Sequence, residues 1–275
     1  MNKLIVELKN IIDNNPEATD LYKRNLLKDY LQVIVLRYIY SNAEYSELVF
    51  YGGSALAQCY ELPRLSEDLD FVDISKKIKI VNLANDLRKF FKEEVDLLIK
   101  IKTQKFRIYL KFPVLKELNL ASKSQSNLLF LKVEVFSGFN FCKKYKTEIK
   151  PLFRFNQSVL IKTFDLPTLM STKIRAVLYR QWVKTSKKGT TLISVKGRDY
   201  FDLMWYLQKG VEPNLDCIEI KNKKELRKKL LEIINKIDER SIVLDLENFI
   251  ADHLFVKKLG KNIKNILKKE IENAL

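Results

Sequence analysis

Residues 51–72 read YGGSALAQCYELPRLSEDLDFV, and this stretch sets the strongest constraint on the fold. A Gly-Gly-Ser turn precedes Asp68 and Asp70, which lie two residues apart in an apolar run. Successive strand side chains point to opposite faces, so these two carboxylates share a face. Adjacent carboxylates repel each other unless a cation lies between them, and oxygen ligands of this kind suit Mg²⁺ or Mn²⁺.

The glycine turn predicts an anion site. Gly52 and Gly53 carry no side chains, so their backbone N–H groups can point at a phosphate. Ser54 opens a helical pattern, and a helix N-terminus favours anions. Each motif alone has an ordinary explanation, because Ser commonly caps helices and Asp-x-Asp is common in turns. Together they favour metal-assisted chemistry on a nucleotide, with Gly53 and Ser54 on its terminal phosphates.

These residues resemble the nucleotidyltransferase superfamily, whose hallmark is Gly-Ser followed by Asp-x-Asp. More narrowly, residues 52–56 together with residues 64–71 are similar to the AbiEii/AbiGii-type nucleotidyltransferase toxins of bacterial toxin–antitoxin and phage-abortive systems. The resemblance returns at residues 173–176 (KIRA) and 197–203 (GRDYFDL). It implies the superfamily fold, a nucleoside triphosphate (NTP) substrate and an antitoxin encoded beside the protein.

Composition excludes several other classes. The chain of 275 residues has 47% hydrophobic and 31% charged residues, which is ordinary for a folded soluble protein. No run is long enough for a membrane helix, and acidic Glu7 interrupts any signal peptide, so we expect a cytoplasmic protein without membrane contact. Three unpatterned cysteines argue against a disulfide framework or a cysteine-ligated zinc site. His253, the single histidine, is interpreted as a structural or surface residue.

The net charge of +16 favours polyanions or nucleotides as partners. Between Leu166 and Arg198 there are eight basic residues and no acidic one. A lysine-rich composition that merely covers solvated surface is the alternative, but a solvated helix usually mixes charges of both signs. We therefore expect a phosphate-binding surface here, and a mobile loop at Lys184–Ser194.

Hydrophobic periodicity predicts two domains. Residues 1–164 are expected to form an α/β (α+β) nucleotidyltransferase fold, a mixed sheet flanked by helices. Residues 165–275 are expected to form an all-α helical bundle. In the first domain we expect helices at 21–41, 54–60 and within 78–102, and strands at 47–51, 69–72, 106–112 and 128–136. In the second we expect helices at about 167–182, 198–208, 223–238, 244–255 and 262–273.

Glu134 is the candidate for a third metal ligand. It is the only acid between Glu117 and Glu148, and it lies centrally in a strand rich in β-branched residues. A carboxylate in such a place is costly unless it is paired. The alternative partner is a neighbouring lysine.

Lys173 and Arg180 are seven residues apart and so share one face of their helix. The family resemblance implies a functional lysine at Lys173. There it would act as a mobile point charge on the triphosphate, with a transient phosphate rather than a fixed carboxylate as its partner. Arg180 and Arg175 are secondary candidates, and a solvated basic stripe is the alternative.

The resemblance also implies a functional aspartate at Asp199 or Asp202. Such a residue would accept a proton from the attacking hydroxyl or orient Lys173. Asp199 is preferred, although the sequence does not show which of the two points inward. The alternative for Asp199 is that it stabilises the helix dipole and pairs with Arg198.

These observations favour a metal-dependent nucleotidyltransferase toxin that moves a nucleoside monophosphate from an NTP to an acceptor hydroxyl. By resemblance the acceptor is RNA, such as a tRNA 3′ end. Transfer to a small molecule such as an antibiotic is the second hypothesis, and the basic stretch argues against it. A non-catalytic RNA- or protein-binding module is the third, and the intact motifs argue against that.

Overall fold

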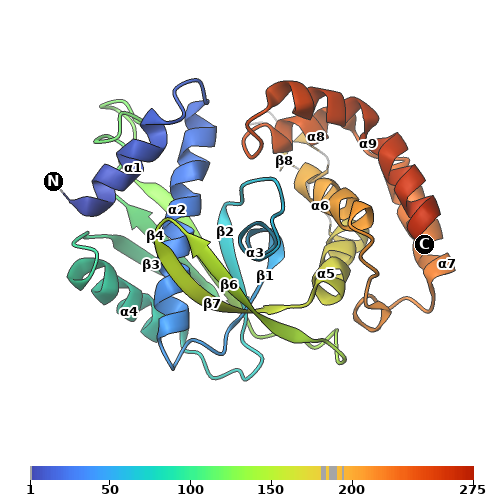
Figure 1. Ribbon diagram of the computed structural model, residues 1–275, viewed down its shortest axis with the longest axis horizontal. Coiled ribbons are helices and arrows are strands. Elements are labelled where there is room, and N and C mark those ends of the chain that lie inside the picture. Colours follow the sequence, from blue (N-terminus) through green and yellow to red (C-terminus); the bar gives the residue numbers. More distant parts are fainter. Residues whose placement is uncertain (1, 181–183, 186–190, 194) are drawn as a thin grey trace. The chain divides into compact units, whose positions relative to one another are not determined.

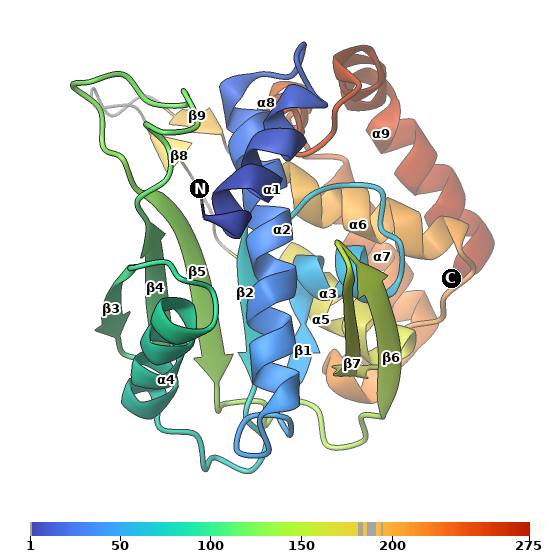
Figure 2. The same cartoon turned by 60° about the vertical axis from the view of Figure 1, so that its left-hand side comes forward.

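The computed structural model describes residues 2–180, 184–185, 191–193 and 195–275 (Figures 1 and 2). This described part of the chain forms two compact units. Unit 1 comprises Met1–Phe139 and Thr147–Thr163, and unit 2 comprises Asn140–Lys146 and Phe164–Leu275. The predicted domains, 1–164 and 165–275, differ from these units in placing residues 140–146 and Phe164 with the first domain.

Within its described residues, unit 1 is built around a seven-stranded mixed sheet with the strand order β3-β4-β5-β2-β1-β7-β6. The β2–β5 and β1–β7 pairs are parallel, whereas the β1–β2, β3–β4 and β4–β5 pairs are antiparallel. This confirms the predicted mixed sheet and places β2 at its centre. The strands are β1 Val49–Tyr51, β2 Asp68–Val72, β3 Lys100–Gln104, β4 Arg107–Phe112, β5 Leu129–Phe136, β6 Thr147–Arg154 and β7 Gln157–Phe164.

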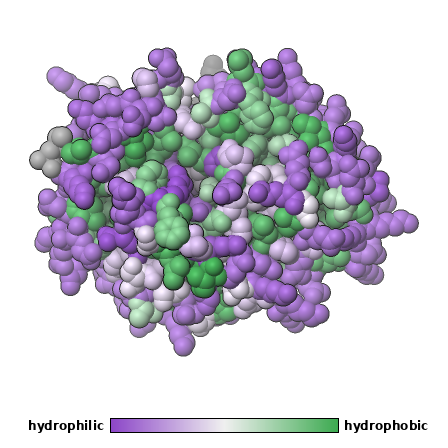
Figure 3. Space-filling model, viewed as in Figure 1, coloured by the Kyte–Doolittle hydropathy of each residue, from purple (hydrophilic) through white to green (hydrophobic). Residues whose placement is uncertain are grey.

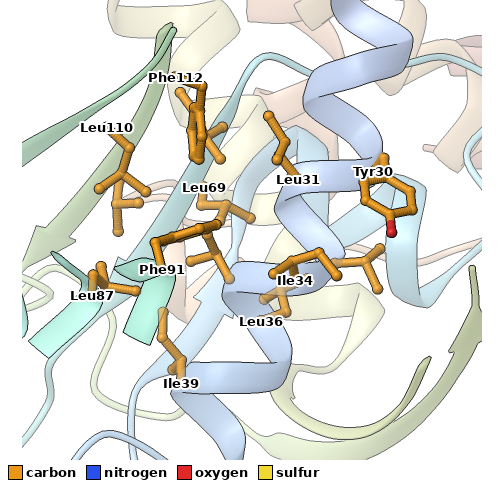
Figure 4. Packing of buried hydrophobic residues seen from close by; sticks show 14 of the residues in the cluster. Tyr30, Leu31, Ile34, Leu36, Ile39, Leu69, Leu87, Phe91, Leu110 and Phe112 are labelled. Atoms are coloured by element: carbon orange, nitrogen blue, oxygen red, sulfur yellow. The ribbon is translucent and has the colours of Figure 1, made fainter. Parts of the chain in front are cut away.

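Helices cover this sheet and enclose its core. Figure 4 shows side chains of α2 and α4 meeting those of β2 and β4. The Phe91 and Phe112 rings pack edge to face with centroids 5.1 Å apart, and Leu31 and Leu69 are fully buried beside them. The helices of unit 1 are α1 Lys3–Asp13, α2 Asp20–Ser41, α3 Gly52–Cys59 and α4 Ile80–Glu93.

Unit 2 is helical apart from a two-stranded sheet formed by β8 and β9, so the expected all-α character does not extend to these strands. Helix α5 begins after Asp165, whose side chain accepts a hydrogen bond from the Thr168 N–H, and has proline in its first turn. Helix α6 lies so close to α8 that a Cβ atom at Gly197 would be 2.9 Å from the backbone of Ile242. The elements are α5 Leu166–Tyr179, β8 Lys184–Thr185, β9 Thr191–Ile193, α6 Gly197–Gln208, the 3₁₀-helix η1 Leu215–Cys217, α7 Lys223–Ile234, α8 Glu239–Leu246 and α9 His253–Ala274.

A disulfide joins Cys142 and Cys217 within unit 2. The sequence argued against a disulfide framework and did not anticipate this single pair. Spacing could not reveal the pair, because residues 140–146 leave the sheet region and join unit 2. Cys59 remains a free thiol, and burial raises its pKa to about 12.

Several predicted elements end elsewhere. The helix expected within 78–102 stops at Glu93, and the exposed strand β3 follows. The helix expected at 244–255 lies earlier, because Asp238 caps α8 by accepting hydrogen bonds from the N–H groups of Arg240 and Ser241. Most of the predicted mobile loop, Lys184–Ser194, lies outside the described residues.

The face shown in Figure 3 carries mainly hydrophilic side chains, with smaller apolar areas among them. In the part of the chain that the structure describes, no helix combines the length and the apolar character that a membrane span requires.

Candidate active site

The two carboxylates predicted to share a face do so. Asp68 and Asp70 lie on β2 and are half-buried, whereas Leu69 and Phe71 between and after them are fully buried on the other face. This alternation follows from the two-residue period of a strand. The central strand therefore presents two adjacent carboxylates on one side of the sheet.

The glycine turn lies directly against these carboxylates. Gly52 has φ +81°, a conformation that favours glycine, and a Cβ atom there would be 2.7 Å from Asp70 Oδ2. A Cβ atom at Gly53 would be 2.5 Å from Arg64 Nη2. Gly52 is thus favoured by both its φ and the close approach of Asp70, whereas a side chain at Gly53 would require the Arg64 guanidinium to shift. Helix α3 begins at Gly52, so its first N–H groups lie in this turn.

Ser54 is tied to the carboxylate strand. The residue is fully buried, and its Oγ donates a hydrogen bond to the main-chain oxygen of Asp68. The hydroxyl is therefore engaged within the protein, whereas the backbone N–H of Ser54 lies in the first turn of α3. The same hydrogen bond fixes the start of α3 against the start of β2.

Glu134 lies beside Asp70 but is held by two cations. β2 and β5 pair in parallel with Asp70 opposite Glu134 and Asp68 opposite Lys132. Lys132 Nζ lies 2.8 Å from Asp68 Oδ2 and 2.9 Å from Glu134 Oε1. Arg107 Nε lies 2.7 Å from the same Glu134 oxygen. The structure therefore shows the alternative named above, an ion pair between Glu134 and the neighbouring Lys132.

Burial and pairing act in opposite directions on these groups. Burial raises the pKa of Asp68, and the Lys132 ammonium offsets only part of that effect. Burial lowers the pKa of Lys132, but Asp68 and then Glu134 outweigh it and hold that pKa well above its ordinary value. Lys132 is therefore a charged group at neutral pH.

The donor chemistry of Asp68 and Asp70 fits Mg²⁺ or Mn²⁺. Both offer carboxylate oxygens from one strand, and the side-chain-free Gly52 leaves the space beside Asp70 clear of a Cβ atom. Glu134 does not join them in this arrangement: among the described residues, no three Asp, Glu, His or Cys side chains form a metal-binding group. Its assignment as a third ligand stays a prediction.

In unit 2, the KIRA and GRD motifs form one buried ionic cluster. Lys173 Nζ lies 2.8 Å from Asp199 Oδ1 and 2.7 Å from Asp202 Oδ2. Arg180 Nη1 lies 2.8 Å from Asp199 Oδ2. The side chains of Lys173, Asp199 and Asp202 are 11%, 4% and 0% exposed.

This cluster corrects two expectations. Lys173 has fixed carboxylate partners, so the prediction of a lysine with only a transient partner is wrong for this structure. Asp199 was preferred over Asp202 as the aspartate that points inward. In the structure both aspartates contact Lys173. The alternative for Asp199, a pair with Arg198, is not the arrangement in the structure: Asp199 contacts Lys173 and Arg180, and Arg198 Nε lies 3.3 Å from Asp245 Oδ2.

The cluster carries more positive than negative charge. Burial acts to raise the pKa of Asp199, but Lys173, Arg180 and Lys196 outweigh it and hold that pKa well below its ordinary range. Burial and the neighbouring Arg198 lower the pKa of Lys196. A cavity of about 40 Å³ borders Arg180, Lys196 and Asp199, which is room for about one water molecule.

Sequence reasoning missed Arg107 and Lys196 as members of these two clusters, and it anticipated Lys132 only as the unnumbered lysine that could pair with Glu134. Lys132 had a visible signal, since it shares a strand face with Glu134 at a spacing of two. Arg107 joins only through the pairing of β4 with β5, where it lies opposite Glu134.

The chain belongs to a family of nucleotidyltransferase toxins. The model of the family described as "Nucleotidyl transferase AbiEii toxin, Type IV TA system" matches residues 35–273. This confirms the resemblance drawn from the glycine turn, the Asp-x-Asp strand and the two later motifs. No curated protein shows a significant match to the sequence.

Solved structures of low identity resemble the chain. The crystal structure of JHP933 from Helicobacter pylori is 17% identical and has a TM-score of 0.47, covering 90% of this chain and 94% of that one. A putative nucleotidyltransferase from H. pylori is also 17% identical, with a TM-score of 0.46 and coverage of 90% and 96%. An antigenic nucleotidyltransferase-like protein from Paracoccidioides brasiliensis is 16% identical, with a TM-score of 0.42 and coverage of 86% and 97%.

Proposed function

We propose that this protein transfers a nucleoside monophosphate from an NTP to an acceptor hydroxyl, with release of pyrophosphate, as the toxin of a toxin–antitoxin system. One observation carries the proposal: Asp68 and Asp70 lie side by side on the central strand, and the Gly52–Gly53 turn lies against them. The turn offers N–H groups to phosphates and the strand offers oxygens to a hard cation. Membership of the AbiEii family supports the same chemistry.

Asp68 and Asp70 would hold Mg²⁺ or Mn²⁺, with Glu134 joining if its two cations release it. When bound, such a metal activates the acceptor hydroxyl and stabilises the developing charge on the phosphates. The N–H groups of Gly53 and Ser54 would orient the terminal phosphates at the start of α3. The buried hydrogen bond from Ser54 to Asp68 keeps this phosphate site in register with the carboxylates.

We assign Lys173, Arg180 and Asp199 to the same reaction on the strength of the family motifs. Lys173 would neutralise the leaving pyrophosphate, and Arg180 would assist it. Asp199 holds both cations in the ligand-free protein and would orient Lys173 or accept the proton of the attacking hydroxyl. Asp202 fixes the lysine from its other side.

RNA is the acceptor that the charge distribution favours, and a tRNA 3′ end is the acceptor that the family resemblance suggests. Unit 2 holds 26 of the 50 Lys and Arg residues but only 15 of the 34 Asp and Glu residues. Four lysines with helical spacing share one face of α9, and none of them forms an ion pair with a described carboxylate: Lys257, Lys261, Lys264 and Lys268. A small-molecule acceptor such as an antibiotic would gain nothing from this extended basic face.

As an AbiEii-type toxin, the protein would act in the cytoplasm beside a cognate antitoxin. Co-expression of the toxin with its neighbouring gene, scored by colony growth, would identify the antitoxin.

The decisive test incubates the protein with each labelled NTP, Mg²⁺ and total bacterial RNA. We expect label on RNA for at least one NTP. Absence of label on RNA, combined with label on a small-molecule fraction, would support the antibiotic-type hypothesis. Nucleotide binding without transfer to any fraction would support a non-catalytic module.

The α9 face has its own test, in which all four lysines are replaced by Gln. The control replaces four exposed lysines of unit 1: Lys9, Lys77, Lys92 and Lys102. If α9 contacts RNA, its variant should reduce the slope of log K against log salt by roughly 0.7–0.9 per lost phosphate contact. The control should change the slope less, whereas equal slopes in both variants would show that α9 is solvated surface. Lys187 and Lys188, which belong to the acid-free basic stretch between Leu166 and Arg198, lie outside the described residues, as does the side chain of Lys184.

A further inference from the structure

Lys132 occupies a place that a metal would need. Its ammonium lies 2.8 Å from Asp68 and 2.9 Å from Glu134, so it bridges two of the three carboxylates on this face. The side chain is 28% exposed, which leaves it a route to solvent. The bridge follows from strand register, because β5 places Lys132 opposite Asp68 and Glu134 opposite Asp70.

The bridge solves an electrostatic problem of the ligand-free protein. Asp68, Asp70 and Glu134 project from adjacent strands and would repel one another without cations; Arg107 contacts Glu134 alone, whereas Lys132 contacts both Glu134 and Asp68. A lysine ammonium is a compact charge with three donors on a flexible stem. Because its side chain is flexible, the lysine can neutralise the carboxylates and can also move away from them.

A divalent cation and the ammonium compete for the same oxygens. Lys132 Nζ lies 2.8 Å from Asp68 Oδ2. A metal bound to the same oxygen would be strongly repelled by this ammonium. Coordination of a metal by this oxygen therefore requires Lys132 to move. An NTP brings phosphate oxygens that can accept the displaced ammonium, so its presence would offset the cost of the movement.

We propose that Lys132 is a built-in counter-ion that holds the carboxylate site in the ligand-free protein and exchanges with the metal when a nucleotide binds. The lysine then transfers its hydrogen bonds from Asp68 and Glu134 to the nucleotide phosphates. The exchange makes free metal bind weakly and couples metal binding to nucleotide binding, and such coupling is reciprocal. This inference rests on the proposed function, because it assumes that Asp68 and Asp70 bind a metal.

The test measures Mn²⁺ affinity by electron paramagnetic resonance of free Mn²⁺, with and without a non-hydrolysable NTP analogue. The protein variants are wild type, Lys132→Met, and Lys162→Met as a matched control. Lys162 is also a strand lysine, with a side chain 26% exposed and, among the described residues, Glu47 as its carboxylate partner. Melting temperatures with and without Mn²⁺ accompany each titration, and Lys132→Gln serves if the Met variant does not fold.

In wild type, the analogue should strengthen Mn²⁺ binding. In Lys132→Met, Mn²⁺ alone should bind at least about tenfold more tightly than in wild type, as expected for removal of one adjacent positive charge. The added effect of the analogue should shrink, and Mn²⁺ should raise the melting temperature more than in wild type. Lys162→Met should behave as wild type.

Two results would overturn the inference in distinguishable ways. If Lys132→Met and wild type bind Mn²⁺ equally while the analogue still strengthens binding in both, the lysine is not a counter-ion for the metal, and the proposed function stands. If wild type binds no Mn²⁺ even with the analogue, both the exchange and the metal-dependent function fail.

Discussion

Replacing Gly52 with Ala should damage the chemistry of the site far more than the stability of the fold. Gly52 has φ +81°, and a left-handed conformation costs a non-glycine residue about 1–2 kcal/mol. For a protein of this size, each kcal/mol lowers the melting temperature by about 2–4 °C. The strain alone therefore predicts a loss of about 2–8 °C.

The added methyl group has a second effect that strain does not describe. Its carbon would lie 2.7 Å from Asp70 Oδ2, so the carboxylate must rotate away. A displacement of about 1 Å in a catalytic constellation costs on the order of 100-fold in rate. We expect the rate of nucleotide transfer to fall by that order in Gly52→Ala.

Gly210→Ala is the matched control. Gly210 has φ +65°, but no atom lies within 4 Å of the position that a Cβ would take. It should lose similar stability through strain and keep wild-type transfer. The assays are thermal melting and transfer of label from NTP to RNA. Wild-type transfer by a folded Gly52→Ala variant would refute the placement of Asp70 in the reactive site.

Three further predictions concern the buried hydrogen bonds and ion pairs. Lys173→Met should lower the free energy of unfolding by about 3–5 kcal/mol, because it leaves Asp199 and Asp202 buried without the ammonium between them. Denaturant titration measures this loss, and a loss below about 1 kcal/mol would contradict the prediction. Asp199 has a lowered pKa, so its ion pairs contribute stability above about pH 4 that is lost as the pH falls further. Between about pH 4 and pH 2, the free energy of unfolding should therefore fall less steeply for Asp199→Asn than for wild type. Parallel curves for the two proteins would count against the pairing. Ser54→Ala should cost about 1 kcal/mol through loss of the hydrogen bond to the Asp68 carbonyl and should also slow transfer; unchanged stability and transfer would show that this bond does not position the strand.

The local part of the site could be predicted from sequence. Asp68 and Asp70 share a face because a strand alternates, and the glycines precede a helix as their pattern indicates. These features depend on neighbours in the chain. For the same reason the ends of α2 and α6 fall within one residue of their predicted limits.

The ion pairs of the site could not be predicted in the same way. Arg107 reaches Glu134 only because β4 and β5 pair in one particular register. Lys173 on α5 meets Asp199 and Asp202 on α6 only because these two helices pack against each other. Such contacts depend on tertiary structure, which periodicity does not contain.

The β6–β7 hairpin shows why some elements were missed altogether. Pro151 lies inside β6, and proline lowers the expectation of a strand because it cannot donate to the ladder. The structure tolerates it because β6 is the edge strand of the sheet. The turn residues Phe155 and Asn156 both have positive φ. Of the two, only asparagine is a residue type that is common in turns and so predicts one from the sequence.

The central claim is that Asp68 and Asp70 form the centre for nucleotidyl transfer, and labelled phosphates test it most directly. Wild type and Asp70→Asn would be compared with NTP labelled at either the α- or the γ-phosphate, in the presence of Mg²⁺ and RNA, after melting curves show that both are folded. We predict that wild type places the α-label on RNA and releases the γ-label as pyrophosphate, and that Asp70→Asn does neither. Transfer of the γ-label to RNA, or undiminished α-labelling by Asp70→Asn, would contradict the claim.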